Sequence, residues 1–230
     1  MKKIGVIAAM NEEMQEIEKI MNNIQKVKLY EQVFFEGKIG SKNIVLAEAG
    51  VGKVNAARVT QILIDKFGVD TIVNVGSAGA VNNDLKIGDI VIGKNIVQHD
   101  FDITAFGHPK GYISNVGLEI ESTPMLVDRM KEIANLHNYD DTHIKIGTIA
   151  SGDIFCTEIK MKEKIRQKFK ADAVEMEGAA IAQVCKLCNI DFIIIRGISD
   201  SPNGNNNVTF EKYLEKASKM CANILQKFLA

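Results

Sequence analysis

The segment at residues 192–198 reads FIIIRGI, and the segment at residues 4–9 reads IGVIAA. Both runs are apolar at consecutive positions, so both faces of each strand must be covered by other elements. This pattern is typical of a largely parallel sheet that lies between two layers of helices. We therefore expect an α/β fold, a three-layer sandwich whose mixed, mostly parallel sheet is covered by helices on both faces.

Apolar runs of strand length alternate with segments of helical period along most of the chain. We expect strands at residues 4–9, 33–39, 44–49, 71–75, 90–97, 144–150, 173–176 and 192–198. We expect helices at residues 12–21, 54–67, 124–136, 158–169, 178–188 and 210–229. The turn-forming cluster GSKN at residues 40–43 predicts a hairpin, which makes the sheet mixed. Residues 100–123 lack clear periodicity and are expected to form a large loop.

The composition is that of a globular protein, with 46% hydrophobic and 25% charged side chains among 230 residues. No repeat or long linker divides the chain, so we expect one domain over residues 1–230. The 28 basic and 29 acidic residues nearly cancel, which argues against nucleic acid or an anionic membrane as partner. The first apolar run is too short for a signal peptide and no run could span a membrane, so we expect a cytoplasmic protein.

The four cysteines are interpreted as reduced thiols, because they lack the density of a disulfide scaffold. Cys185 and Cys188 form a C-x-x-C pair, but no second pair follows at zinc-site spacing and the histidines are scattered. Two small residues on one helical face are the simpler interpretation. We expect no metal site and no cofactor.

Two glycine-rich segments follow predicted strands. GVGK at residues 50–53 lacks the spacing of a Walker loop and has Val54 where that loop needs Ser or Thr. A dinucleotide fingerprint would need glycine in place of Asn55, so both nucleotide motifs fail. The segment is either a plain tight turn or a turn whose N–H groups face a ligand. NVGSAGA at residues 74–80 equally fits close packing or close approach to a ligand at a strand end.

Acidic residues follow three of the predicted strands: Glu12-Glu13, the EME segment at residues 175–177, and Asp200. Each alone is explained by a helix N-terminus. Together at one edge of a sheet they are costly, because neighbouring like charges raise one another's pKa values. With no metal cluster or nucleophilic pair in view, their convergence indicates acid–base cleavage of a glycosidic bond.

Eight short motifs occur in order along nearly the whole chain: IGVIAAMNEE, AGVGKVNAA, NVGSAGA, GDI, FDITAFG, ASGDIF, VEMEGAAIA and RGISD. Together they resemble the 5′-methylthioadenosine/S-adenosylhomocysteine nucleosidases of the nucleoside phosphorylase superfamily. The resemblance implies hydrolysis of these nucleosides, and of 5′-deoxyadenosine, to adenine and a 5-substituted ribose. It places the reaction in methionine salvage and the recycling of S-adenosylmethionine by-products.

The same resemblance implies roles for two catalytic residues. Asp200 would protonate adenine at N7, oriented by Ser199, and Glu13 would activate the attacking water. Adenine is a poor leaving group as an anion, so Asp200 must hold a proton near neutral pH. Its pKa must then lie well above the usual value of about 3.9.

The resemblance further implies a set of substrate-binding residues at matching positions: Ser77, Gly79, Phe155, Cys156, Glu175, Met176, Glu177, Arg196 and Ser199. Within this set, Glu177 would bind the ribose hydroxyls and the Met176 sulfur would lie near the developing positive centre. Phe155 would stack on adenine, and backbone groups of Cys156 would read the edge of the base.

An apolar pocket is expected around the 5′ group of the substrate, since a methylthio group gains from burial. Met10, Val51, Ile103 and Phe210 match the family's pocket positions. The segment around Phe106 corresponds to one that reaches into a neighbouring subunit's site, which implies a homodimer. Differences from the family pattern at Cys156, His108 and Ser114 leave the preference between the two nucleosides open.

Two activities of the same superfamily remain as alternatives, a purine nucleoside phosphorylase and a futalosine hydrolase. An alternative of a different class is a noncatalytic nucleoside-binding protein that kept the fold. Phosphate would need cationic donors where the first strand leads into Asn11-Glu12-Glu13, so hydrolysis is favoured. Arg196 is the one cation close to the proposed site, and we expect it to pair with a carboxylate. Retention of Asp200 and Glu13 argues against a protein that only binds.

Overall fold

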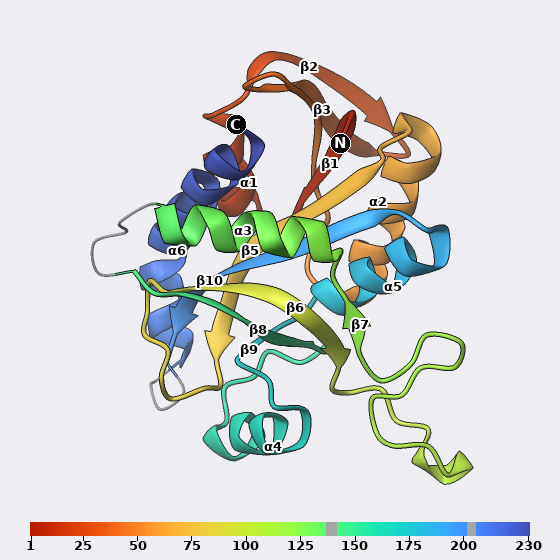
Figure 1. Ribbon diagram of the computed structural model, residues 1–230, viewed down its shortest axis with the longest axis vertical. Helices are drawn as coiled ribbons and strands as arrows, with labels where there is room; N and C mark the ends of the chain where they lie inside the picture. Colours follow the sequence, from red (N-terminus) through yellow and green to blue (C-terminus); the bar gives the residue numbers. More distant parts are fainter. Residues whose placement is uncertain (137–141, 202–205) are drawn as a thin grey trace.

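The fold is known from a computed structural model, which describes residues 1–136 and 142–201 and the backbone of the last helix from residue 206, with side chains again from residue 213. These residues form ten strands and six α-helices (Figure 1). The strands are β1 (Lys3–Ala8), β2 (Asn22–Leu29), β3 (Gln32–Ile39), β4 (Lys42–Glu48), β5 (Thr71–Ala80), β6 (Ile90–Gln98), β7 (Ile120–Glu121), β8 (Ile144–Ser151), β9 (Ala173–Glu175) and β10 (Asp191–Asp200). The helices are α1 (Asn11–Glu18), α2 (Lys53–Phe67), α3 (Pro124–Leu136), α4 (Ile159–Phe169), α5 (Gly178–Cys188) and α6 (Asn206–Leu229).

All ten strands belong to one mixed sheet, in the order β10-β6-β8-β9-β5-β1-β4-β3-β2, with β7 beside β6. The central strands β4, β1, β5 and β10 are parallel to their neighbours in this group, whereas β3 forms antiparallel hairpins with β2 and β4. Helices cover both faces of the sheet. The predicted α/β sandwich with a mixed sheet, and the predicted hairpin, are therefore confirmed.

Part of the sheet closes on itself, which the sequence did not indicate. Strand β10 pairs with both β5 and β6, and β5 pairs also with β9, which is joined to β6 through β8. The strands β5, β10, β6, β8 and β9 thus form a closed ring. The ring brings the ends of β5, β9 and β10 together, and two of the candidate acids, Glu175 and Asp200, are the last residues of β9 and β10.

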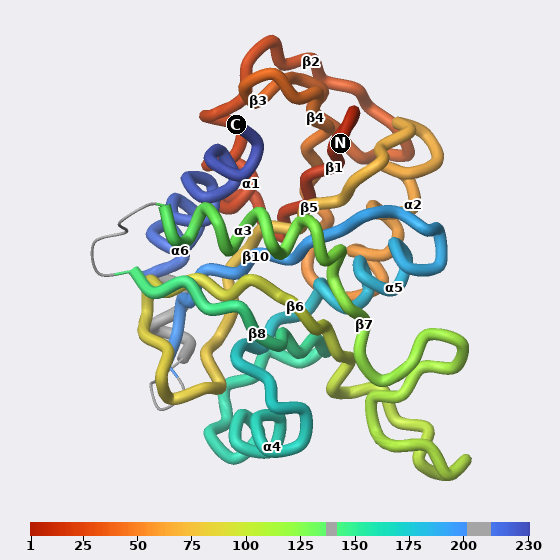
Figure 2. The backbone as a smooth tube through the Cα atoms, viewed as in Figure 1, coloured from red at the N-terminus to blue at the C-terminus, as the bar shows by residue number. Residues whose placement is uncertain are grey.

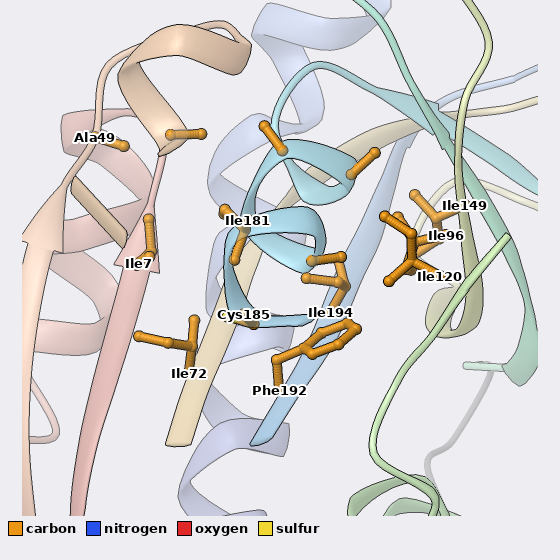
Figure 3. Close-up of a cluster of buried hydrophobic side chains, with 14 of the residues drawn as sticks. Ile7, Ala49, Ile72, Ile96, Ile120, Ile149, Ile181, Cys185, Phe192 and Ile194 are labelled. Atoms are coloured by element: carbon orange, nitrogen blue, oxygen red, sulfur yellow. The ribbon is translucent and has the colours of Figure 1, made fainter. Parts of the chain in front are cut away.

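Two buried clusters fix the helices on opposite faces. Ile181 and Cys185 of α5 pack with Ile72 of β5 and with Phe192 and Ile194 of β10 (Figure 3). On the other face, apolar residues of α1, α3 and α6 pack on the alternate side chains of the same strands, among them Val73, Ile193 and Ile195. The consecutive apolar runs therefore face two separate cores, as their lack of alternation predicts.

Strand β10 contains an irregularity immediately before the candidate acid. Ile198 pairs with Ala78 and Asp200 pairs with Gly79, so Ser199 is an extra residue in the register. A bulge of this kind turns the following side chain to the face opposite to that expected from regular alternation. A Cβ atom at position 79 would lie 2.8 Å from Asp200 Oδ1, so glycine is needed beside the acid.

Several details differ from the prediction. Strand β2 was not predicted, because its sequence NNIQKVKL is mostly polar and it lies at the edge of the sheet. Helix α1 ends at Glu18 instead of residue 21, and residues 100–123 include a short 3₁₀ turn and β7. The segment that follows β6 projects away from the sheet (Figure 2). No helix within the described residues is long and apolar enough to cross a membrane.

Candidate active site

A cavity of about 330 Å³ lies at the carboxyl ends of the central strands. It is lined by Ala9, Met10, Glu13, Val51, Ser77, Ala78, Gly79, Ile154, Phe155, Cys156, Val174, Glu175, Met176, Glu177 and Asp200. Open parallel sheets bind ligands at this edge. The three acidic segments that lie far apart in the sequence meet here, and the cavity is otherwise mostly apolar.

Glu13 is buried at the start of α1 and is held at both carboxylate oxygens. Its Oε2 accepts hydrogen bonds from the N–H groups of Ala9 (3.0 Å) and Met10 (3.2 Å). Its Oε1 accepts from the N–H (2.8 Å) and the hydroxyl (2.9 Å) of Ser77, which lies on β5. Three of these four donors are backbone groups, so the position of Glu13 is fixed by the ends of two strands.

The carboxylate of Glu175 is buried at the N-terminus of α5. It accepts hydrogen bonds from the Ser151 hydroxyl, from the N–H groups of Glu177 (3.1 Å) and Gly178 (2.7 Å), and from the Arg196 guanidinium. An anion here also benefits from the partial positive charge of the helix end. Glu175 thus anchors the turn that carries Met176 and Glu177 into the cavity.

Arg196 lies beneath these acids rather than in the cavity wall. It is 1% exposed, and its Nη2 donates to Asn74 Oδ1 at 2.7 Å and lies 3.5 Å from Glu177 Oε2. The predicted pairing of Arg196 with a carboxylate is present twice, with Glu175 and Glu177. Arg196 therefore offsets part of the negative charge that the acids concentrate at this edge.

Glu177 shows the effect of that concentration of charge. Burial, reinforced by the Glu175 carboxylate, raises the pKa of Glu177 to about 7, while Arg196 acts in the opposite direction. Its Oε1 accepts a hydrogen bond from the Gly52 N–H at 2.9 Å. The adjacent Lys53 N–H donates to Asp153 at 2.8 Å. The GVGK turn thus directs two of its N–H groups to side chains of this protein.

Asp200 occupies the other end of the cavity, at the end of β10. Its Oδ2 accepts a hydrogen bond from Lys162 Nζ at 2.6 Å, and the Ser199 hydroxyl also bonds to its carboxylate. Burial raises the pKa of Asp200 above its usual value, although the Lys162 ammonium group opposes that rise. The surroundings of Asp200 therefore favour its protonated form relative to a free aspartate.

The structure gathers most, though not all, of the predicted site residues around this cavity. Met10, Val51, Ser77, Gly79, Phe155, Cys156, Glu175, Met176 and Glu177 line it together with Glu13 and Asp200. Ser199 lies beside Asp200, and its Oγ lies 3.3 Å from the Ala78 carbonyl oxygen, which is an alternative acceptor for the same hydroxyl proton. Ile103 and Phe106 do not line the cavity of this chain, and Phe106 is 81% exposed on the projecting segment. Phe210 lies outside the residues whose side chains are described.

Sequence reasoning did not identify Lys162 or the apolar wall residues Ala9, Ala78, Ile154 and Val174. Small and apolar residues carry no chemical signature of a site, and Lys162 belongs to a lysine-rich helix. Within the described part of the chain, no group of three or more His, Cys, Asp and Glu side chains could hold a metal ion. Cys185 is buried and Cys188 half-buried on α5, and both are free thiols.

Comparison with known proteins identifies the family. The family model of the phosphorylase superfamily matches residues 3–230. The 5′-methylthioadenosine/S-adenosylhomocysteine nucleosidase of Staphylococcus haemolyticus (strain JCSC1435) is 38% identical over 227 residues, 98% of each chain. The chain belongs to this nucleosidase family of the phosphorylase superfamily.

Solved structures agree with this family assignment. The nucleosidase from S. pneumoniae, solved with the transition-state inhibitor MT-ImmA, has a TM-score of 0.93 and 38% identity. The match covers 99% of this chain and 98% of that one. The futalosine hydrolase of Helicobacter pylori strain 26695 has the same TM-score, 0.93, with 37% identity over 99% of this chain and 97% of that one. The family's shared fold thus carries at least two named hydrolase activities.

Proposed function

We propose that this protein hydrolyses the N-glycosidic bond of 5′-methylthioadenosine and S-adenosylhomocysteine, and of 5′-deoxyadenosine, releasing adenine and the 5-substituted ribose. The observation that carries the proposal is the meeting of Glu13, Glu177 and Asp200 around one cavity, with a fully buried arginine beside Glu177. The substrates are supported by the similar proteins, which are 5′-methylthioadenosine/S-adenosylhomocysteine nucleosidases. This activity belongs to methionine salvage and the recycling of S-adenosylmethionine by-products.

At the base end, Asp200 acts as the general acid. Its raised pKa favours the protonated form, which donates to N7 of adenine as the bond from N9 to C1′ breaks. The electron pair of that bond passes into a neutral purine instead of an anion, which lowers the barrier to departure. Phe155 lies against the face of the base, and the Cys156 backbone reads its edge.

At the ribose end, Glu13 accepts the proton of the attacking water. One of its four donors is the Ser77 hydroxyl, which rotates freely and so can yield its place to a water molecule. Glu177 binds the ribose hydroxyls, and the Met176 sulfur lies near the positive charge that develops on the sugar. Several carboxylates near one oxocarbenium-like centre stabilise it electrostatically.

Water, rather than phosphate, is the nucleophile. Among the described residues that line the cavity, four are acidic and none is basic. A phosphate dianion needs cationic or N–H donors, and the donors near Glu13 are already bound to its carboxylate. The same carboxylate can deprotonate water, which agrees with hydrolysis.

The test is the release of free adenine from 5′-methylthioadenosine and S-adenosylhomocysteine by the purified protein, with and without phosphate. We expect equal rates in both buffers. A strict requirement for phosphate would assign the protein to the phosphorylases instead. Futalosine belongs in the same assay, because a futalosine hydrolase is among the similar structures. Exclusive turnover of futalosine would reassign the substrate while leaving the bond cleavage intact.

The 5′ substituent is proposed to lie against Met10 and Val51, which supply an apolar wall. Ile103, Phe106 and Phe210 are proposed to complete that wall when two copies associate, with the Phe106 segment of one copy reaching the other's site. The 81% exposure of Phe106 leaves its side chain available to a second copy in the proposed homodimer. The free thiols of the four cysteines agree with action in the cytoplasm.

A further inference from the structure

A lysine lies directly behind the candidate general acid. Lys162, on α4, is 1% exposed, and its Nζ donates to Asp200 Oδ2 at 2.6 Å and to the Ser201 carbonyl at 3.1 Å. It is not among the residues that line the cavity, so it reaches substrate only through Asp200. The pair joins a helix to the end of β10 across 38 residues of sequence.

A fully buried lysine is costly, because its ammonium group loses its water. If this position served only to orient Asp200, the neutral hydroxyl of Ser199 would do so without that cost. A positive charge changes the acid in a way that a neutral donor does not, since it favours the ionised form of Asp200. That form arises during the reaction, when the proton leaves.

We propose that Lys162 is a positioning residue that makes Asp200 a stronger proton donor, by stabilising the carboxylate that forms as its proton passes to the departing adenine. The proposal rests on the function proposed above. In this step the O–H bond of Asp200 breaks, an N–H bond forms at N7, and Lys162 keeps all its protons. Asp200 regains a proton from solvent after the base has left.

The other groups that face Asp200 do not supply this charge. The Cys156 thiol is close to both Lys162 and Asp200, and burial raises its pKa to about 11, so it is neutral at pH 7. Ser199 contributes a hydroxyl, and Gly79 contributes only backbone. Within the described residues, Lys162 is the charged group that contacts the acid, and burial and Lys162 push its pKa in opposite directions.

The experiment is the pH dependence of kcat/KM for 5′-methylthioadenosine in Lys162→Met, Lys162→Arg and Lys164→Met. The high-pH limb of the profile, where activity is lost, reports ionisation of Asp200. Ionisation of Glu177, whose pKa is raised by burial to about 7, should be the same in all three variants. Because the Lys162 ammonium group favours the ionised form of Asp200, its removal in Lys162→Met should shift the high-pH limb to a pH about one unit or more higher. The plateau rate should fall on the order of tenfold, because the carboxylate forms without its partner.

Lys162→Arg keeps the charge and should leave the limb near its original pH. Lys164→Met removes an exposed lysine of the same helix and should change neither quantity. In an Asp200→Asn background, Lys162→Met should cause no further loss, since there is no acid left to assist. If Lys162→Met does not fold, as judged by circular dichroism, Lys162→Gln takes its place with the same expectations.

The proposal would be overturned if the high-pH limb of Lys162→Met did not shift. It would also be overturned if Lys162→Met lowered the rate as much in the Asp200→Asn background as in the wild type. In either case Lys162 would form only a structural ion pair. Failure of the proposed function is a separate result. In that case the wild-type protein itself would release no adenine from any of the nucleosides.

Discussion

The two ends of the cavity hold their carboxylates in different ways. At the ribose end, Glu13 and Glu175 accept several hydrogen bonds from backbone N–H groups, and Arg196 lies below. At the base end, Asp200 is held by a lysine and a hydroxyl. Backbone donors fix the Glu13 and Glu175 carboxylates in place, whereas burial raises the pKa of Asp200. The difference separates acids that bind and accept from one that donates.

The sharpest test of this contrast is Asp200→Asn, which keeps the size of the side chain and removes its proton. We expect kcat to fall by roughly 10²–10⁴ while the protein remains folded. Adenine release by the purified variant is the measurement, with circular dichroism as a check on folding. Asp191→Asn, at the other end of β10, serves as the control. Near-native turnover in Asp200→Asn would mean that another group protonates the base.

Glu13→Gln tests the ribose end. The amide keeps one of the two accepting oxygens but cannot take a proton from water, so kcat should fall on the order of 10²-fold or more. Substrate affinity, measured by calorimetry in the inactive variant, should change much less. Glu12→Gln alters the exposed neighbour on the same helix and should retain full activity. A comparable loss in both variants would point to damage to α1 instead.

Glu177→Gln tests how much the buried Glu177 carboxylate lowers the free energy of unfolding at the ribose end. Because the folded-state pKa of Glu177 is about 7, above the usual 4.5, the folded protein holds this proton more tightly than the unfolded chain. Its contribution to stability is complete below pH 4.5 and is lost as the pH rises to about 7. Over this pH range the free energy of unfolding of the wild type should therefore fall by on the order of 3 kcal/mol, whereas Glu177→Gln should not show this loss.

Urea unfolding of both proteins at pH 5 and pH 8 measures that difference. Relative to the wild type, the free energy of unfolding of Glu177→Gln should be higher at pH 8 than at pH 5. Glu12→Gln should follow the wild type. If the difference in free energy of unfolding did not change with pH, the pKa of Glu177 would not be raised by burial.

The smallest expected effect is on packing beneath the ribose end. A Cβ atom at position 76 would lie 2.2 Å from Arg196 Nη1, and the buried guanidinium has no room to withdraw. Gly76→Ala should therefore lower the free energy of unfolding by about 1–3 kcal/mol. It should also weaken catalysis, because Arg196 positions Glu175 and Glu177. Unchanged stability in urea would mean that the arginine is mobile.

Local patterns in the sequence were sufficient for the framework and for most of the acids. Consecutive apolar positions identified the central strands, and acids directly after strands were recognisable because parallel strands end at one edge. The polar strand β2 and the closure of β10 onto β6 were not recognisable. The first lacks apolar alternation, and the second depends on pairing between residues far apart in the chain.

The burial of Lys162 beside Asp200 could not be predicted from the sequence. This lysine lies in the run IKMKEKIRQKF, between Lys160 and Lys164, which are both exposed. The three lysines are alike in composition and spacing, and only the tertiary packing of α4 near β10 buries the middle one. For Ile103 and Phe106 the proposed partner is a second copy, so a single chain cannot show their role.

The extra residue in β10 makes the direction of the acid depend on strand pairing as well as on the side chain itself. Ile198 belongs to the core beneath α5, and regular alternation would turn the residue two positions later towards the same layer. Because Ser199 is left out of the pairing with β5, Asp200 instead lies opposite Gly79 and beside the cavity. A chain that paired Ser199 with Gly79 would keep every amino acid and lose the proton donor for the base.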